Sequence, residues 1–223
     1  MNSSPLAQEV SAHLQAKCLQ PNPTWLHNFL SSQKSTIPLP ALKQTAFFRI
    51  INGDVTGSLQ STPTSIFPAD ILNANVPERR IAGPVVVQVL DIEDIGRSRW
   101  SQVEALEADE RGETTKGREI IRVVPGEEGE TEQRTSSGPH KLLLQDAQGR
   151  RAYGIELSNI EGVGLNMNIG TKITLRDVTV ARGVLLLDPK SVTVLGGKIE
   201  ELHKEWKEAR KAVLKASAAR GRN

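Results

Sequence analysis

The 223-residue sequence is poor in the residues on which several classes of protein depend. Its single cysteine, Cys18, excludes an internal disulfide and any zinc site built from several cysteines, so we expect a cytosolic or nuclear protein. No apolar run approaches the roughly 20 residues that cross a bilayer. Residues 1–5 show no basic patch followed by an apolar run. We therefore expect neither a membrane protein nor a secreted one.

Aromatic residues and net charge are also low. Aromatics make up 4% of the chain, and 28 Lys and Arg face 26 Asp and Glu, which gives a net charge of +2. A surface that stacks bases needs aromatic rings, and strong binding to a nucleic-acid backbone needs an excess of positive charge. The composition therefore disfavours a strong nucleic-acid binder.

Motifs for catalysis are missing as well. The sequence contains no GxSxG, no P-loop and no GxGxxG, and Gly162-Val163-Gly164 is typical of a turn. The four histidines lie far apart, and none has a second ligand at a metal-binding spacing: they are His13, His27, His140 and His203. We expect no enzyme activity, no cofactor, no metal and no small-molecule substrate. An enzyme whose site is assembled from distant residues is the alternative, and no set of residues supports it.

Residues 1–80 are predicted to be helical. Apolar residues recur at helical spacing in three stretches separated by prolines: Leu6, Val10, Leu14 and Cys18; Trp25, Leu26, Phe29 and Leu30; and Leu42, Ala46, Phe47, Ile50 and Ile51. We expect a three-helix bundle whose aromatic residues belong to its core rather than to a site.

Residues 81–197 have the pattern of strands. Runs rich in β-branched and aliphatic residues predict five strands, at 85–92, 140–146, 153–157, 171–180 and 184–187, with Val192 and Val194 extending the sheet. Five short strands favour a closed barrel such as an OB-fold, with an SH3-like barrel as the alternative. The expected core residues are Val87, Val89, Leu143, Leu175, Leu185 and Leu187. Gly183 is expected in a turn conformation that other residues resist.

Residues 198–223 are predicted to form a C-terminal helix, which makes the fold class α+β. Its apolar seam steps by three and four: Ile199, Leu202, Trp206, Ala209, Val213 and Ala216. The segment carries eight basic and four acidic residues. One interpretation is a helix that covers the barrel and leaves a basic face in water. The other is a contact with nucleic acid or with the import machinery.

A long insertion, residues 93–139, separates the first two predicted strands. It holds 12 acidic and 7 basic residues and few apolar ones, and loops of this length are usually functional or disordered. A capping box at Ser101–Glu104 predicts a helix over about 101–109. The apolar run 120–124 is either a partner contact or an extension of a barrel hairpin. The candidate partner-binding residues are the anchors Trp100, Ile120, Ile121 and Val123 and the flanking bases Arg118 and Arg122.

The segment 182–197 resembles the RecQ-mediated genome instability protein 1 family, together with Trp25-Leu26 and Leu142–Asp146. The resemblance extends from about Pro23 to Trp206, and the order of elements agrees with it. The residues that carry it are Trp25, Gly183, Val184, Leu185, Leu186, Leu187, Pro189, Val192, Leu195, Gly196 and Gly197.

This resemblance implies a non-catalytic nuclear subunit with an OB-fold. Members of the family bind topoisomerase III and act with a RecQ-family DNA helicase in DNA replication, repair and homologous recombination, where the complex dissolves double Holliday junctions and decatenates DNA. The resemblance implies that the insertion at 93–139 reaches into the topoisomerase gate, and that DNA is contacted weakly or indirectly. A single-stranded nucleic-acid binding module of the OB type remains the alternative.

Overall fold

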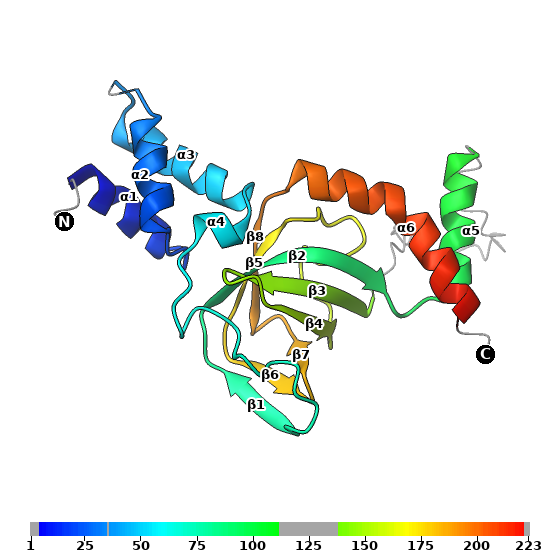
Figure 1. Ribbon diagram of the computed structural model, residues 1–223. Coiled ribbons are helices and arrows are strands. Elements are labelled where there is room, and N and C mark those ends of the chain that lie inside the picture. Colours follow the sequence, from blue (N-terminus) through cyan, green and yellow to red (C-terminus); the bar gives the residue numbers. More distant parts are fainter. Residues whose placement is uncertain (1–4, 35, 112–137, 221–223) are drawn as a thin grey trace, which may run out of the picture.

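The computed structural model describes residues 5–34, 36–111 and 138–220 (Figure 1). Four helices come first: α1 (Pro5–Gln15), α2 (Pro23–Ser31), α3 (Leu39–Ile51) and α4 (Val55–Ser58). A curled sheet follows, with α5 (Arg99–Glu110) inside the insertion, and α6 (Glu200–Arg220) ends the chain. Figure 1 shows the N-terminal helices on one side of the sheet, and α6 running over the sheet to meet α5 on the other side.

The three helices predicted for the N-terminal region are present, but they do not form a self-contained bundle. The side chain of Asn22 accepts hydrogen bonds from the backbone of Thr24 and Trp25 and so caps α2, while Asp54 caps the unpredicted α4. The apolar core of these helices includes Val86 and Leu195 of the barrel. The prediction of a three-helix bundle is therefore incomplete, because the barrel supplies part of the helices' core.

The sheet has eight strands, whereas five were predicted together with an extension at Val192 and Val194, which is a separate strand in the structure. The eight strands are β1 (Glu78–Ile81), β2 (Val85–Asp94), β3 (His140–Asp146), β4 (Arg151–Glu156), β5 (Lys172–Leu175), β6 (Val178–Ala181), β7 (Val184–Leu187) and β8 (Val192–Gly196). The predicted fourth strand is two strands, because Asp177 adopts a φ of 50° and bends the chain. β1 was missed because its sequence, Glu-Arg-Arg-Ile, lacks the apolar pattern of a strand.

The bend at Asp177 closes the barrel. β5 pairs with β2, whereas β6 pairs with β7, so one segment joins both ends of the ring. The ring is completed by the antiparallel pairs β2–β3 and β3–β4 and by the parallel pair β4–β7. This is the closed arrangement that we expected of a small barrel.

The barrel core contains five of the six residues predicted for it: Val87, Val89, Leu175, Leu185 and Leu187. The prediction that Leu143 belongs to the core is wrong. Side chains alternate along β3, and Leu142 and Leu144 are the ones that point inward. Gly183 is confirmed in its turn conformation, with a φ of +84°. A Cβ atom at Gly183 would lie 2.9 Å from the carbonyl oxygen of Leu72.

Helix α6 is confirmed, but its predicted seam is correct only as far as Trp206. Leu202 and Trp206 pack against the barrel core, whereas Ala209, Val213 and Ala216 are exposed. From Trp206 the inward residues are Arg210 and Leu214 at steps of four, because this half of the helix faces α5 as well as β2. A pattern of apolar residues alone does not reveal a half-buried arginine. Among the described helices, none is both long and apolar enough for a bilayer span.

Candidate partner-binding site

The insertion begins and ends at a narrow neck, formed by residues 94–96 and 138–140. The backbone N–H of Ile95 donates to the carbonyl of Pro139 at 2.9 Å, and Gly96 N–H donates to the side chain of Asp94 at 2.9 Å. A Cβ atom at Gly96 would lie 2.7 Å from the carbonyl oxygen of Gly138. The two ends of the insertion are therefore held together by close backbone contact, which requires glycine at position 96.

A buried pair, His140 and Glu156, supports this neck. Glu156 Oε2 lies 2.6 Å from His140 Nδ1 and accepts the His140 backbone N–H at 3.1 Å. Its other oxygen accepts the N–H of Ile160 at 2.8 Å. Both side chains are almost completely buried, so each bond is made away from water. In the sequence, Glu156 is simply an acidic residue at the end of a predicted strand, so its role in supporting the neck could not be predicted.

Helix α5 confirms the predicted helix, but it starts earlier than the capping box suggested. The side chain of Ser98 accepts the N–H of Ser101 at 3.1 Å, and its carbonyl accepts the first helical hydrogen bond. Ser101 therefore lies inside the helix. Gln102 fixes α5 to the neck, since its Nε2 donates to the carbonyls of Asp94 at 2.8 Å and Arg97 at 3.2 Å.

Helices α5 and α6 pack side by side and are joined by ion pairs (Figure 1). Glu107 lies 2.5 Å from Lys215, and Glu110 lies 2.6 Å from Lys211. The hydrogen bond from Lys215 lowers the pKa of Glu107, and the bond to Glu110 raises the pKa of Lys211. Acidic residues of the insertion therefore already neutralise part of the basic charge of α6.

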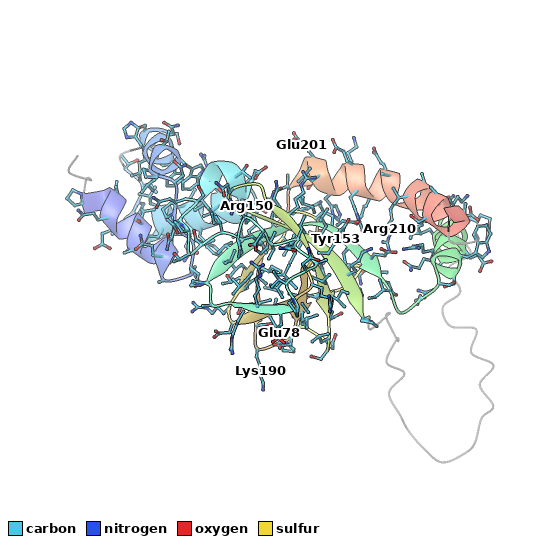
Figure 2. The ribbon with its side chains drawn as sticks, turned by 60° about the horizontal axis from the view of Figure 1, so that its bottom comes forward. Glu78, Arg150, Tyr153, Lys190, Glu201 and Arg210 are labelled. Carbon is cyan, nitrogen blue, oxygen red and sulfur yellow. The ribbon has the colours of Figure 1, made fainter. Side chains whose placement is uncertain are left out.

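Trp206 and Arg210 connect α6 to strand β2. Trp206 Nε1 donates to Asp91 Oδ1 at 2.7 Å, and the Arg210 guanidinium lies 4.8 Å from the centre of the Trp206 ring. Figure 2 labels Arg210 on the half of α6 that approaches α5. Burial lowers the pKa of Arg210, while the charges of Asp91 and Asp94 oppose that shift.

The structure places one of the predicted anchor residues. Trp100 lies on α5 with 53% of its surface exposed, as a partner contact requires. The other candidates fall within 112–137 and so lie outside the described residues: Arg118, Ile120, Ile121, Arg122 and Val123. The set is therefore not brought together by what the structure describes.

An apolar outer face of the barrel was not predicted. On β3, β4 and β7 the outward positions include Leu143, Tyr153, Ile155, Val184 and Leu186, in two cross-strand rows. Leu157, directly after β4, is a sixth apolar residue beside them. Leu157 and Tyr153 are the most exposed of the six, and Figure 2 labels Tyr153. We call these six residues the outer face. A strand with one face open to water usually alternates apolar and polar residues. The apolar runs 142–144 and 184–187 lack this alternation, and this was the sequence signal that could have indicated an apolar outer face.

The residues of the family motif serve the fold rather than a single site. Leu185 and Leu187 lie in the barrel core, Leu195 packs against the N-terminal helices, and Pro189 is exposed. Gly197 approaches the backbone carbonyl of Ile51 too closely for any side chain. The remaining motif residues are placed as follows: Val192 is buried, Val184 and Leu186 face outward, Gly196 has a φ of +87°, and Trp25 stacks on Phe29 at 5.4 Å.

Within the described residues, no three side chains of His, Cys, Asp or Glu gather as metal ligands would. Strong hydrogen bonds and ion pairs hold the neck and the two helices, and the outer face is apolar. This arrangement is suited to binding a macromolecular partner.

Comparison with known proteins identifies the barrel and the helices. The family model described as "RMI1, N-terminal OB-fold domain" matches residues 67–210, and "RMI1, N-terminal helical domain" matches residues 14–52. The barrel is therefore an OB-fold rather than an SH3-like barrel.

Curated relatives agree with these models. RecQ-mediated genome instability protein 1 of Schizosaccharomyces pombe is 32% identical over 168 residues, which cover 68% of this chain and 72% of the relative. The Mus musculus protein of the same name is 31% identical over 63% of this chain, and the chain spans 22% of its length. Tudor domain-containing protein 3 of Danio rerio is 25% identical over 70% of this chain and is matched over 17% of its own length.

The names of the first two relatives refer to RecQ and to genome stability. The family model covers more than half of the chain, and the fission yeast relative is matched over most of its length. The chain belongs to the RecQ-mediated genome instability protein 1 family.

Proposed function

We propose that this chain is a non-catalytic nuclear subunit that binds topoisomerase III and acts with a RecQ-family helicase. In this role it promotes decatenation and the dissolution of double Holliday junctions, and it contacts DNA weakly or indirectly. The observation that carries the proposal is the neck, because it anchors a long acidic insertion rigidly to an OB-fold of this family. The two proposed partners, topoisomerase III and a RecQ-family helicase, follow from membership of the family.

The outer face is the proposed docking surface for the enzyme. Apolar side chains on three neighbouring strands offer a contiguous area whose burial stabilises a complex. The insertion then acts on the gate of the enzyme. Its net charge of −5, from 12 acidic and 7 basic residues, suits a surface that is basic because it holds DNA.

Single-stranded DNA binding is the second candidate, and one observation favours it. OB-folds bind nucleic acid on the face of their second and third strands, where Tyr153 lies with Lys141 at 5.4 Å from its ring. The rest of this face is aliphatic, which favours protein instead. Fluorescence anisotropy with a labelled single strand at two salt concentrations separates the two candidates, because backbone binding weakens steeply with salt.

The main test is co-purification with topoisomerase III from the same source, followed by a decatenation assay. We compare the intact chain with a variant in which residues 112–137 are replaced by a short Gly/Ser linker, which keeps α5 on α6. We expect the linker variant to bind the enzyme but not to stimulate it. The single change Ile121→Asp should weaken binding or stimulation without unfolding the barrel. Unchanged binding and stimulation in both variants would contradict the role of the insertion.

A second pair of variants tests the outer face. Tyr153→Glu places a charge in its centre, whereas Thr193→Glu places one at an exposed position of β8, outside it. We expect Tyr153→Glu alone to lose co-purification, by at least tenfold in affinity, because it desolvates a charge in an apolar contact. Equal binding by both variants would show that the enzyme docks elsewhere.

A further inference from the structure

Strand β1 forms one edge of the eight-stranded sheet. It pairs with β6 on one side, and on its other side it pairs with no strand that the structure describes. Figure 1 shows β1 at the bottom of the molecule, away from the N-terminal helices and from α5 and α6. An open edge presents backbone N–H and C=O groups that can pair with a further strand.

The hydrogen bonds to β6 determine which backbone groups of β1 are free. The N–H of Arg182 donates to the carbonyl of Pro77, just before β1. Because the bonding direction alternates along a strand, Arg79 also faces β6, whereas the N–H and C=O groups of Glu78 and Arg80 point away from it. The two-residue turn after β6 agrees, since it directs the last residue of β6 toward β7 rather than β1.

The side chains at this edge are charged. Side chains alternate along a strand and Ile81 lies in the barrel core, so Glu78 and Arg80 lie on the outer surface. Arg80 binds Asp177 through Nε at 3.3 Å, and its side chain is 69% exposed. Glu78 is exposed, and no described residue forms an ion pair with it. The edge therefore offers one acidic and one basic group to a neighbour.

These two charges are self-complementary in one register. When two β1 strands run antiparallel about a two-fold axis at Arg79, Glu78 of each copy lies opposite Arg80 of the other. Their outward backbone groups then meet, and each opposed pair exchanges two hydrogen bonds. A shift by two residues would set Glu78 against Glu78 or Arg80 against Arg80, as would an in-register parallel pair. The charge pattern therefore selects the antiparallel register.

Arg79, on the two-fold axis, does not oppose this pairing. Its guanidinium is bound by both carboxylate oxygens of Asp70, at 2.6 Å and 2.7 Å, so that each copy brings a neutral ion pair to the axis. Charges on an edge strand usually prevent association. In β1 their order admits a second β1 strand, whereas a strand of another charge pattern would bring like charges together.

We propose that β1 is a homodimerisation edge, at which a second copy of this chain adds its own β1 in the antiparallel register. Because the strand has only four residues, the contact is small, and the dimer forms reversibly as the concentration of the chain rises. The pairing uses no residue of the outer face. It goes beyond the proposed function and does not depend on it.

The test is sedimentation equilibrium of the full chain over a range of concentrations. We expect Glu78→Arg and Arg80→Glu each to weaken dimerisation at least about tenfold, because two cross-strand attractions become repulsions. Lys190→Glu is the matched control, since it makes the same change of charge as Arg80→Glu at an exposed position outside β1. Figure 2 labels Glu78 and Lys190. The control should dimerise as the parent does.

Exchange of the charges gives the decisive comparison. The double variant Glu78→Arg with Arg80→Glu restores opposite charges in the same register, and so does an equimolar mixture of the two single variants. Both should dimerise as the parent does. A parent that stays monomeric at every concentration, or a dimer that the single variants leave unchanged, would overturn the proposal.

Amide hydrogen exchange of the parent gives a readout that needs no variant. The amides of Glu78 and Arg80 should gain protection as the concentration rises, whereas the amide of Arg79 is bonded to β6 and should be protected throughout. Protection of Glu78 and Arg80 that does not change with concentration would contradict the pairing. None of these measurements involves the topoisomerase, so their failure is distinguishable from failure of the proposed function.

Discussion

The barrel carries helices on two sides, and the two attachments differ in kind. On the N-terminal side, the helices share an apolar core with the barrel through Val86 and Leu195, and Gln88 bonds to the backbone of Val55 and to Gln145. On the insertion side, α5 and α6 bury Val103, Gln102 and Leu214, and they are also joined by ion pairs near the surface, which involve Glu107 and Glu110. The first attachment consists of buried contacts, whereas the second combines a few buried residues with ion pairs that are in contact with solvent.

This difference assigns different tasks to the two sides. Buried apolar contact and buried hydrogen bonds are insensitive to salt and are lost only when the domain unfolds. Surface ion pairs contribute little and are screened by ions. We therefore expect the N-terminal helices to stay attached to the barrel in all conditions in which it is folded, and the ion pairs of α5 to weaken in high salt.

The largest effect should come from Asp146, which holds the segment between the helices and the barrel. Its carboxylate is fully buried and accepts the backbone N–H groups of Phe67 at 2.7 Å, Arg150 at 2.8 Å and Gln148 at 2.9 Å. Asp146→Ala leaves these donors unpaired, so we expect about 3–5 kcal/mol less free energy of unfolding in urea. Asp70→Ala, at an exposed ion pair, is the control and should change little. Equal midpoints for the two variants would refute the buried role.

A buried charge at the same attachment should give a pH-dependent effect. Burial lowers the pKa of Lys172 to about 8, although the charge of Asp54 opposes it. Between about pH 8 and 10.5 the unfolded chain therefore binds a proton that the folded chain has lost, and the free energy of unfolding rises with pH.

Lys172→Met removes this cost. We expect the variant to be more stable than the parent by about 1–3 kcal/mol at pH 7, since 1 pKa unit corresponds to about 1.4 kcal/mol and the bond from Lys172 to the Gly170 carbonyl is lost. The gain should shrink as the pH rises through 8. Urea unfolding at pH 7 and 9.5 measures it. A gain that is independent of pH would contradict the assignment.

Two adjacent glycines allow the close approach of α3 to the barrel to be measured. Gly196 and Gly197 both have positive φ, but only Gly197 would bring a Cβ against the backbone of Ile51. Gly196→Ala should cost about 1–2 kcal/mol through its backbone conformation alone. Gly197→Ala should cost clearly more, because the clash displaces the helix. Equal losses in thermal unfolding would show that α3 can move away freely.

The smallest effect is expected at the α5–α6 contact. Glu107→Gln breaks the pairs with Lys211 and Lys215, whereas Glu104→Gln changes an exposed acid of the same helix for which no ion pair is described. We expect faster amide hydrogen exchange in α5 for Glu107→Gln alone, with an unchanged global midpoint. High salt should reproduce the effect in the parent. Since the pKa of Glu107 is lowered, the contact is complete above its ordinary value of 4.5 and is lost as the pH falls below it.

The sequence predicted the parts of the fold that depend on local patterns. Helical spacing located α1, α2 and α3, and aliphatic runs located β2, β3 and β7. When one face of a helix or strand is buried, its apolar residues recur at a regular spacing that can be recognised in the sequence. It did not show the bend at Asp177, since a single left-handed residue leaves no pattern. The predicted buried face of α6 was also wrong beyond Trp206, because Arg210 packs against residues that are distant in the sequence.

The candidate site was less accessible to prediction than the fold. Trp100 was singled out because it is an aromatic residue in a polar insertion; the structure shows that it is exposed, and its role in partner binding stays a prediction. The neck depends on Glu156 meeting His140 across two strands, and the outer face depends on which strands are neighbours. Both arise from the register of the sheet, which no local pattern encodes.

The neck also has a consequence for how this family can diversify. The backbones of Ile95 and Pro139 are joined by a hydrogen bond, so the chain between them forms a closed loop. The entropic cost of closing such a loop grows only with the logarithm of its length. Doubling that length would cost only about 0.6 kcal/mol. We therefore expect the barrel to tolerate the exchange of one inserted sequence for another, so that the insertion can change during evolution without redesign of the domain that holds it.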